Sequence, residues 1–321
     1  MAPILPRLEV YMEKSADLCY TMPYHFIQRH TDMNYVIFDL EWNQPADPSV
    51  MVTDPLLLTG EIIEIGAVKL DDDFKLIDEL RLYITPKHYT RMHKRIAALT
   101  GIRDKDLMTR GIPFPEAYEK FREWCGEEYA FMTWSMSDVP MLVDNMLLHD
   151  IDVSDLPVCY DIQRVFGREI MRSSTRFALD HAVEILGEKG DTAHDALNDS
   201  RNTAKICNHL DLDVYLEEYG AKVFAEAPRS KVYRSHAEAL ADPELLTSEC
   251  PWCGNEIKAE PWIQGNHCYM TCGVCEEEDE FFMQLFVMRQ GTDAFRVRRL
   301  MYEMSDDLWD IYMDKKEPMT V

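Results

Sequence analysis

The chain has 321 residues, of which 46% are hydrophobic, and it carries a formal net charge of −25 at pH 7. This length predicts two domains, or one large domain with an appendage, and the hydrophobic share is enough to bury a substantial core. The acidity argues against broad, non-specific binding to duplex nucleic acid, because a phosphate backbone is held mainly by Lys and Arg. A nuclease is not excluded, since it needs positive potential only along one channel and bound divalent cations supply much of it.

Neither a membrane span nor a secretory signal is evident in the sequence. No run approaches the roughly 18 apolar residues that a spanning helix needs, and residues 1–9 lack a basic region followed by an apolar run. We therefore expect a cytoplasmic protein without membrane contact, whose cysteines stay reduced. Clustered cysteines should then bind a metal rather than form disulfides.

The first predicted elements follow an N-terminal extension, residues 1–33, that carries no motif. Strands are expected at 35–38, 61–70 and 80–84, which predicts an antiparallel meander. Helices and strands then alternate: the predicted helices are 116–124, 139–148, 177–186 and 196–209, and the predicted strands are 129–134 and 158–162. This order predicts an α/β domain with a mixed sheet over about residues 34–215.

Three smaller segments are expected beyond this domain. Residues 216–246 are predicted to form a helical connector. A cysteine-rich module over 247–288 should end in a strand at 281–288. Within the C-terminal segment, 289–321, residues 295–313 have amphipathic spacing and predict a helix.

Two acidic residues directly follow a buried strand near the start of the α/β domain. Asp39 and Glu41 end the run Tyr-Val-Ile-Phe-Asp-Leu-Glu, where side chains alternate, so both acids lie on one face. Mg²⁺ and Mn²⁺ prefer carboxylate oxygens. Two such cations about 3.5–4 Å apart can hold the attacking and leaving oxygens of a phosphodiester.

Asp138, His194 and Asp199 are the other candidates for the same site. A helix beginning near Ala196 would direct Asp199 inward and leave His194 on the preceding loop, where an imidazole can accept a proton from water. Singly, each has a plainer interpretation, since Asp138 would suit a helix N-cap and His194 a solvated surface. Their combination with the first two acids favours a metal-dependent nuclease site.

Together these motifs resemble the DEDDh family of 3′→5′ exonucleases, the DnaQ-like branch of the ribonuclease-H-like fold. The resemblance covers about residues 34–215. Within this range, it also includes the segments 63–69, 99–102 and 179–187. Residues 38–44, Phe-Asp-Leu-Glu-Trp-Asn-Gln, are most similar to the bacterial sporulation-inhibitor (KapD-like) exonucleases. The resemblance implies an α/β exonuclease fold with a mixed central sheet.

The resemblance also implies roles for individual residues. Asp39, Glu41 and Asp199 would hold the catalytic Mg²⁺ or Mn²⁺, and Asp39 would bridge to a second cation. Asp138 would complete the cluster, partly through water, and His194 would be the general base. By the same resemblance, five residues fall at positions that would grip the 3′-terminal nucleotide: Leu40, Trp42, Thr100, Gly101 and Ile102. For Trp42, stacking on the base and packing in the core are equally favoured.

Positive charge gathers just before the segment 99–102. Its members are Lys87, Arg91, Lys94 and Arg95, and they are the best candidates for a phosphate track. Arginines also recur every four residues from Arg164 to Arg176, but Gly167 weakens a continuous helix there. An ordinary solvated face is the simpler interpretation of that second pattern.

Two Cys-x-x-Cys pairs have the spacing of a zinc ribbon, in which four thiolates hold one structural Zn²⁺. The pairs are Cys250 with Cys253 and Cys272 with Cys275, and residues 257–270 between them should form a hairpin. Cys268 and His267 are spare donors, so the ligand set stays open. The acidic run 276–280 makes a protein a better partner for this module than nucleic acid.

The sequence therefore predicts a metal-dependent 3′→5′ exonuclease. It would release nucleoside 5′-monophosphates from single-stranded RNA or DNA 3′ ends, and the sequence does not decide between the two. The alternative is an adaptor with little or no activity that binds a protein partner through the zinc ribbon and the acidic surface.

Overall fold

The computed structural model of the chain describes most of the protein. The described residues are 33–47, 50–52, 58–153, 156–173, 175–225, 231–251, 253–265, 268–277, 279–291 and 293–316. The predicted N-terminal extension, apart from residue 33, lies outside them, as does the spare donor His267.

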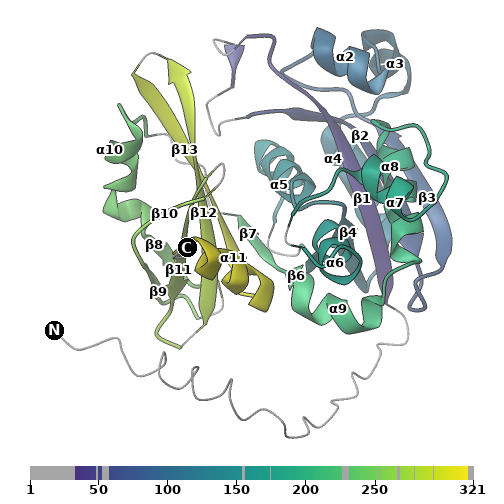
Figure 1. Cartoon of the computed structure of the whole chain (residues 1–321). Coiled ribbons are helices and arrows are strands. Elements are labelled where there is room, and N and C mark those ends of the chain that lie inside the picture. Colours follow the sequence, from purple (N-terminus) through teal and green to yellow (C-terminus); the bar gives the residue numbers. More distant parts are fainter. Residues whose placement is uncertain are drawn as a thin grey trace, which may run out of the picture. The chain divides into compact units, whose positions relative to one another are not determined.

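Six strands form a mixed sheet in the order β3–β2–β1–β4–β5–β6 (Figure 1). Its strands are β1 Asn34–Asn43, β2 Glu61–Leu70, β3 Leu76–Tyr83, β4 Tyr129–Thr133, β5 Cys159–Asp161 and β6 Gly220–Ala221. β1 pairs antiparallel with β2 and parallel with β4, and β2 pairs antiparallel with β3. The predicted antiparallel meander and mixed sheet are confirmed.

Eight helices surround this sheet or connect its strands in the described part of the chain. They are α2 Lys94–Thr100, α3 Asp104–Arg110, α4 Phe114–Cys125, α5 Asp138–Leu148, α6 Ile162–Glu169, α7 Leu179–Ile185, α8 Ala196–Cys207 and α9 Leu212–Tyr219. The four helices predicted from apolar spacing correspond to α4, α5, α7 and α8. The helices α2 and α3 were not predicted, because seven residues give too little periodicity to recognise.

The two faces of β1 pack against different helices because its side chains alternate. Phe38 belongs to the apolar cluster that includes Phe121 of α4 and Leu142 of α5. Ile37 belongs to a second cluster with Leu197 of α8. The side chains that follow Ile37 on its own face, at positions 39 and 41, are therefore directed toward the helix α8, which lies across the sheet (Figure 1).

A second sheet follows in the C-terminal part of the chain, with the order β7–β13–β12–β11–β9–β8 and with β10 paired to β11. Its strands are β7 Val223–Ala225, β8 Thr247–Glu249, β9 Glu256–Ala259, β10 Ile263–Gln264, β11 Tyr269–Val274, β12 Glu280–Gly291 and β13 Ala294–Glu303. The remaining elements are α10 His236–Leu240, the 3-10 turn η2 Pro243–Leu245 and α11 Asp306–Lys316.

Three predictions for this region differ from the structure. The predicted helix over 295–313 is a strand up to residue 303, because β13 pairs with β12 along its length and cross-strand pairing overrides the helical spacing. Only 306–316 is helical. The predicted helical connector, 216–246, contains the strands β6 and β7 as well as short helical turns, and the predicted module end at 288 falls inside β12.

The largest apolar cluster takes residues from both sheets, with Phe38 and Phe131 on one side and Phe282 and Tyr302 on the other. Arg298 of β13 adds polar contacts to α5. Its guanidinium donates to the carbonyl oxygen of Pro140 at 2.7 Å and lies 2.9 Å from the buried Asp144 carboxylate. The second sheet therefore contacts the helix that begins at Asp138.

Across the part of the chain that the structure describes, no helix combines the length and the apolar character needed to cross a membrane.

Candidate active site

A cleft of about 370 Å³ opens beside the second half of β1. All five predicted catalytic residues line it: Asp39, Glu41, Asp138, His194 and Asp199. They come from β1, from the first turn of α5 and from the start of α8. The structure thus brings together residues from three segments that are far apart in the sequence.

The strand β1 and the helix α8 supply the centre of the cleft. Asp39 and Glu41 face α8, and Asp199 lies in the first turn of that helix. The ligand atoms of Glu41, His194 and Asp199 all lie within 4.8 Å of one another. The carboxylates of Glu41 and Asp199 can therefore share one cation, with the His194 imidazole beside it.

Asp138 joins this group from the opposite side of β1. It is the first residue of α5, it is 6% exposed, and its carboxylate accepts a hydrogen bond of 3.1 Å from the Leu40 backbone N–H. The N-cap position itself is occupied by Ser137. The carboxylate thus bonds to β1 next to Asp39, so the simple N-cap interpretation of Asp138 does not account for its position.

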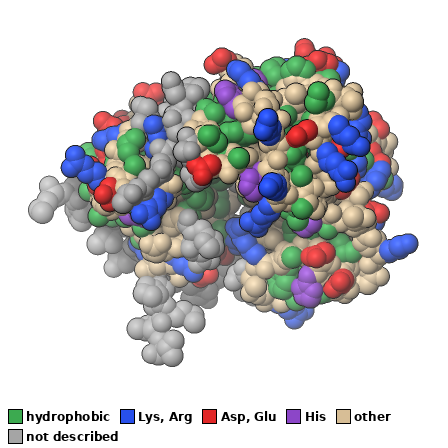
Figure 2. Space-filling model, turned by 90° about the horizontal axis from the view of Figure 1, so that it is seen from above, with side chains coloured by type: hydrophobic (Ala, Val, Ile, Leu, Met, Phe, Trp, Pro, Cys, Tyr) green, Lys and Arg blue, Asp and Glu red, His purple; other side chains and the backbone are tan. Residues whose placement is uncertain are grey.

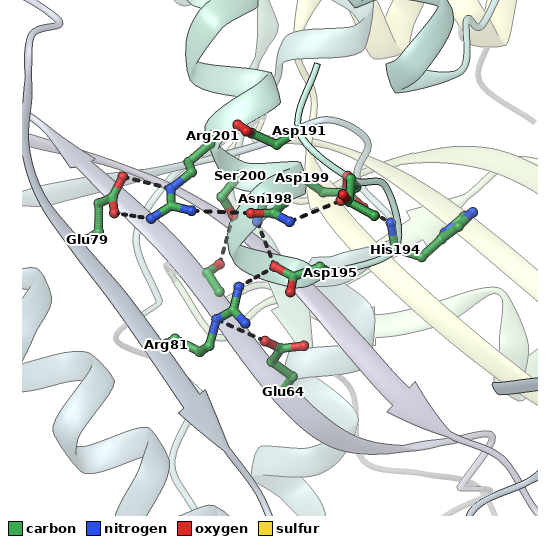
Figure 3. A network of polar contacts seen from close by, with 12 residues as sticks. Glu64, Glu79, Arg81, Asp191, His194, Asp195, Asn198, Asp199, Ser200 and Arg201 are labelled. Carbon is green, nitrogen blue, oxygen red and sulfur yellow. Dashed lines mark hydrogen bonds and ion pairs between the residues drawn. The ribbon is translucent and has the colours of Figure 1, made fainter. Parts of the chain in front are cut away.

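His194 lies on the loop before α8, as predicted, and is exposed at the edge of the cleft. Its backbone N–H donates to Asp199 Oδ2 at 2.9 Å (Figure 3), and one of its ring nitrogens lies within 4.8 Å of carboxylate oxygens of Glu41 and Asp199. The residue has φ 61°, in the left-handed region that non-glycine residues rarely adopt. Such backbone conformations gather at functional sites, where the surrounding structure enforces them.

Burial and mutual repulsion raise the pKa values of the clustered carboxyl groups. The pKa of Asp39 lies well above its usual value because of burial, followed by the charges of Asp138, Asp199, Glu41 and Glu64. Burial is also the first cause that raises the pKa of Glu41 to about 8, of Asp138 to about 7 and of Asp199 to about 6. Divalent cations would offset this repulsion, and an all-oxygen donor set fits Mg²⁺ or Mn²⁺.

A buried carboxylate that the sequence interpretation missed lies next to this group. Glu64 of β2 is 1% exposed and stands directly opposite Glu41 in the β1–β2 register. Burial raises its pKa to about 7, while the charge of Arg81 lowers it. The Arg81 side chain lies 3.3 Å from Glu64 and also pairs with Asp195, the N-cap of α8 (Figure 3). This chain of charges ties the start of α8 to β2 and β3.

Further contacts hold α8 close to the sheet. Ser200 donates to the Gly66 carbonyl oxygen at 2.8 Å, and Arg201 donates to Glu79 of β3 at 2.9 Å. Gly66 leaves no room for a side chain, since a Cβ there would lie 2.0 Å from the backbone nitrogen of Leu197. The backbone of α8 therefore approaches β2 directly, which fixes the position of Asp199.

The predicted nucleotide grip is only partly placed at the cleft. Leu40 and Trp42 line it, but Thr100, Gly101 and Ile102 are not among its lining residues. The Thr100 hydroxyl donates to a carbonyl within α2, Gly101 ends that helix with φ 73°, and Ile102 is 5% exposed in the core. Because side chains point in different directions around a helix, α2 presents two other residues to the cleft, the buried Ile96 and the exposed Leu99. The motif 99–102 therefore contributes its first member, and not the three that follow, to the lining.

The basic segment 87–95 lies next to the cleft, although of its four predicted residues only Arg95 is among the lining residues. The side chains of Lys87, Arg91 and Lys94 are exposed. Buried Glu61 accepts from the backbone N–H groups of 87–89, and Asn43 donates to the carbonyl oxygens of 89 and 91, which fixes the segment against β1 and β2. Figure 2 shows Lys, Arg and His side chains next to hydrophobic ones over the middle of one face.

The second arginine pattern does not form one helical stripe. The helix α6 ends at Glu169, and Arg172 has φ 49°. The residues after 169 therefore follow a different path from the helix face that carries Arg164 and Arg168.

Three of the four predicted zinc ligands lie together, but Cys272 does not. The ligand atoms of Cys250, Cys253, Cys275 and Asp279 all lie within 4.8 Å of one another. Cys272 lies inside β11, opposite Phe282, and strand alternation directs it into the apolar cluster on the other face of the sheet. Sequence spacing did not reveal this, because it does not show where the strand ends.

The raised pKa values predict that the metal-free protein loses stability as pH rises. Well below pH 3.8 these carboxyl groups are protonated in both the folded and unfolded states, whereas between the unfolded pKa values of 3.8 to 4.5 and the folded values of about 6 to 8 the unfolded state is the more ionised of the two. A pKa that is higher by one in the folded state than in the unfolded state costs at most about 1.4 kcal/mol, and solvent reduces this cost in an open cleft. We therefore expect Tm in EDTA to fall by roughly 5–10 °C from pH 5.5 to 8.

Adding Mg²⁺ should restore Tm more at pH 8 than at pH 5.5, and thermal melts across this pH range test both statements. A Tm that rises with pH in EDTA would contradict them.

Comparison with known proteins places the chain in a family. A family model described as exonuclease matches residues 36–207 of the 321. Among solved structures, the nuclease domain of 3′hExo, a DEDDh family member bound to rAMP, is 23% identical with a TM-score of 0.47 and covers 56% of this chain and 92% of its own. Cell-death related nuclease 4 is 21% identical with a TM-score of 0.46, covering 55% of this chain and 62% of its own. Exonuclease I of E. coli in complex with a dA16 oligonucleotide is 14% identical with a TM-score of 0.47, and the match covers 75% of this chain and 55% of that protein.

The match thus spans less than two thirds of the length of the second and third of these proteins. No curated protein matches the chain. The family model alone covers more than half of the sequence, and its matched residues include the four acids and the histidine that line the cleft. The chain belongs to the exonuclease family.

Proposed function

We propose that this protein is a 3′→5′ exonuclease that depends on divalent metal and releases nucleoside 5′-monophosphates from single-stranded ends. The observation that carries the proposal is the convergence of Asp39, Glu41, Asp138, His194 and Asp199 on one cleft. Their spacing along the chain resembles the DEDDh exonucleases, and residues 38–44 favour a KapD-like branch of that family. We propose that the nuclease domain extends over about residues 34–215.

The carboxylates of Asp39, Glu41, Asp138 and Asp199 would hold two cations, Mg²⁺ or Mn²⁺. Such cations lower the pKa of a bound water molecule and stabilise negative charge on phosphate oxygens. The chain's own residues would supply the rest. His194, exposed at the cleft edge, accepts the proton of the attacking water, and its backbone bond to Asp199 fixes the loop from which its ring extends.

The composition of the cleft supports a terminal nucleotide as the bound group. Apolar side chains of Trp42, Ile96 and Leu99 line it together with the carboxylates. A base and sugar can pack against these apolar side chains while the phosphodiester lies over the acids. Arg95 is the cation of the basic segment that lines the cleft, where it can contact the next phosphate of a single strand. A cleft of about 370 Å³ suits one nucleotide better than a base pair.

Degradation of matched oligonucleotides tests the proposal directly. RNA and DNA of one sequence, each labelled at the 5′ end and carrying either a free or a blocked 3′ end, are incubated with Mg²⁺ or Mn²⁺ and then with EDTA. We expect stepwise shortening from free 3′ ends, release of 5′-monophosphates and complete arrest by EDTA. Shortening from the 5′ end would overturn the direction. No EDTA-sensitive degradation of either polymer would overturn the activity and favour an adaptor function.

Replacing His194 by glutamine is expected to lower the turnover rate by about 10²–10⁴-fold, the usual contribution of a general base. The affinity for Mg²⁺ should change little, because the carboxylates remain. His181→Gln on α7 is a matched control, since this histidine is also exposed but does not line the cleft. Single-turnover rates at saturating Mg²⁺ measure the effect, and an unchanged rate in the His194 variant would rule out its role as base.

A further inference from the structure

Two turns of the second sheet bring three cysteines and one aspartate to the same place. Cys250 and Cys253 lie between β8 and β9, and Cys275 and Asp279 lie between β11 and β12. Cys250 and Cys275 are almost fully buried, whereas Cys253 is exposed. The four residues therefore form a partly enclosed pocket of donor atoms that is separate from the nuclease cleft.

The distances between these donor atoms match a tetrahedral zinc site. With Zn–S bonds of about 2.3 Å and a Zn–O bond of about 2.0 Å, tetrahedral angles place two sulfurs about 3.8 Å apart and a sulfur and an oxygen about 3.5 Å apart. In the structure, Cys253 Sγ and Cys275 Sγ are 3.8 Å apart. Asp279 Oδ2 lies 3.5 Å from Cys250 Sγ and 3.3 Å from Cys275 Sγ.

Short backbone hydrogen bonds shape both turns so that their side chains point inward. The N–H of Gly254 donates to the Cys250 carbonyl oxygen at 2.9 Å, and Gly254 has φ 74°, which a residue with a side chain adopts only with strain. The Cys275 N–H donates to the Asp279 carbonyl oxygen at 3.1 Å. The second bond closes a tight turn that places the Asp279 carboxylate beside the Cys275 thiol.

The apolar cluster in direct contact with these turns is small. The cluster next to them consists of Cys250, Ile257, Cys275, Phe281, Met283 and Met301. Two of its members are the cysteines themselves, so the apolar contacts that join the β8–β9 turn to the β11–β12 turn are few. A shared metal ion would supply the link between the two turns that this small core provides only weakly.

We propose that Cys250, Cys253, Cys275 and Asp279 bind one structural Zn²⁺ and that Cys272 is not a ligand. Thiolates favour Zn²⁺ over Mg²⁺ or Ca²⁺, and four protein ligands leave no open position for chemistry. The aspartate replaces the fourth cysteine that the paired motif would otherwise provide. The site holds the two turns of the second sheet together.

The metal content and coordination of the full-length protein test this proposal without any nuclease assay. Elemental analysis after exhaustive dialysis should give about one zinc per chain. X-ray absorption at the zinc edge should show three sulfur neighbours at about 2.3 Å and one oxygen at about 2.0 Å. Four sulfur neighbours, a different bound metal or no bound metal would each overturn it.

Paired variants distinguish a site in which Asp279 is the fourth ligand from one in which Cys272 is. Asp279→Ala should weaken zinc affinity by roughly tenfold or more in a chelator competition, since even outer contacts of a metal site are worth about 10–100-fold. Asp279→Cys should keep the metal and add a fourth sulfur neighbour. Cys272→Ser and Glu276→Ala, an exposed acid in the same turn, should both keep full zinc content.

The opposite pattern would decide against the proposal. If Cys272→Ser lost the metal while Asp279→Ala retained it, the four cysteines would be the ligands. Because a variant can also lose metal through unfolding, the Tm of each is compared with that of the wild-type protein after zinc removal. These outcomes do not depend on nuclease activity, so they remain informative if the proposed exonuclease function proves wrong.

Discussion

Replacing Asp39 by asparagine should abolish degradation of single strands and, at the same time, raise the thermal stability of the metal-free protein. Burial, followed by the charges of four neighbouring acids, raises the pKa of Asp39 well above its usual value. Losing one of the proposed cation ligands would remove several kcal/mol of charge stabilisation, and about 4 kcal/mol corresponds to roughly 10³-fold in rate. Asparagine does not ionise, so the folded state no longer bears the cost that burial and the neighbouring acids impose on this carboxyl group.

Rates of 3′ shortening at saturating Mg²⁺ and melts in EDTA at pH 8 measure the two effects. Asp73→Asn is the matched control, because Asp73 is exposed in the turn between β2 and β3 and lies away from the cleft. The control should leave rate and Tm close to the wild-type values. Wild-type activity in the Asp39 variant would refute the active-site assignment, and a lower Tm in EDTA would show that repulsion does not dominate the cluster.

Replacing Gly66 by alanine should push α8 away from β2 and displace Asp199. The added Cβ would lie 2.0 Å from the Leu197 nitrogen and 2.1 Å from the Ala196 carbonyl carbon, and backbone atoms cannot rotate aside as a side chain does. Overpacking of this kind costs about 1–3 kcal/mol, or more where the backbone must shift. A displacement of about 1 Å at a catalytic ligand can lower the rate by about 10²-fold.

Gly190→Ala provides the control for this second variant. Its Cβ would meet Val183 at 3.4 Å, an ordinary contact, so stability and rate should stay near wild type. Activity of the Gly66 variant is measured at a temperature at which circular dichroism shows it fully folded. Unchanged activity and Tm would show that α8 is not held against β2 as closely as the structure indicates.

The nuclease part of the fold was largely predictable because local patterns and tertiary contacts agree there. In β2, residues 61–70 form a nearly continuous buried run, and a buried central strand has this pattern. Asp39, Glu41 and Asp199 were found because strand alternation and a helix start are local properties. Asp138 and His194 were found through the resemblance as much as through spacing.

The errors arise where contacts between distant residues decide the structure. The strand β13 carries apolar residues at spacings that also suit a helix, and only its pairing with β12 settles the choice. Glu64 was missed because its position opposite Glu41 depends on the register of two strands, which composition does not reveal. The separation of Cys272 from the other three cysteines was not foreseen, because the end of β11, two residues later, is set by its pairing with β12.

The crowding of acids in the cleft also determines how a cation enters it. At pH 7 the carboxyl group of Glu41 is mostly protonated, since its pKa is about 8, and a cation must displace that proton to bind. Titration calorimetry with Mg²⁺ in two buffers of different ionisation heat should therefore report proton release. The apparent dissociation constant should decrease with each step toward pH 8, so the protein would take up its cofactor most readily under mildly alkaline conditions.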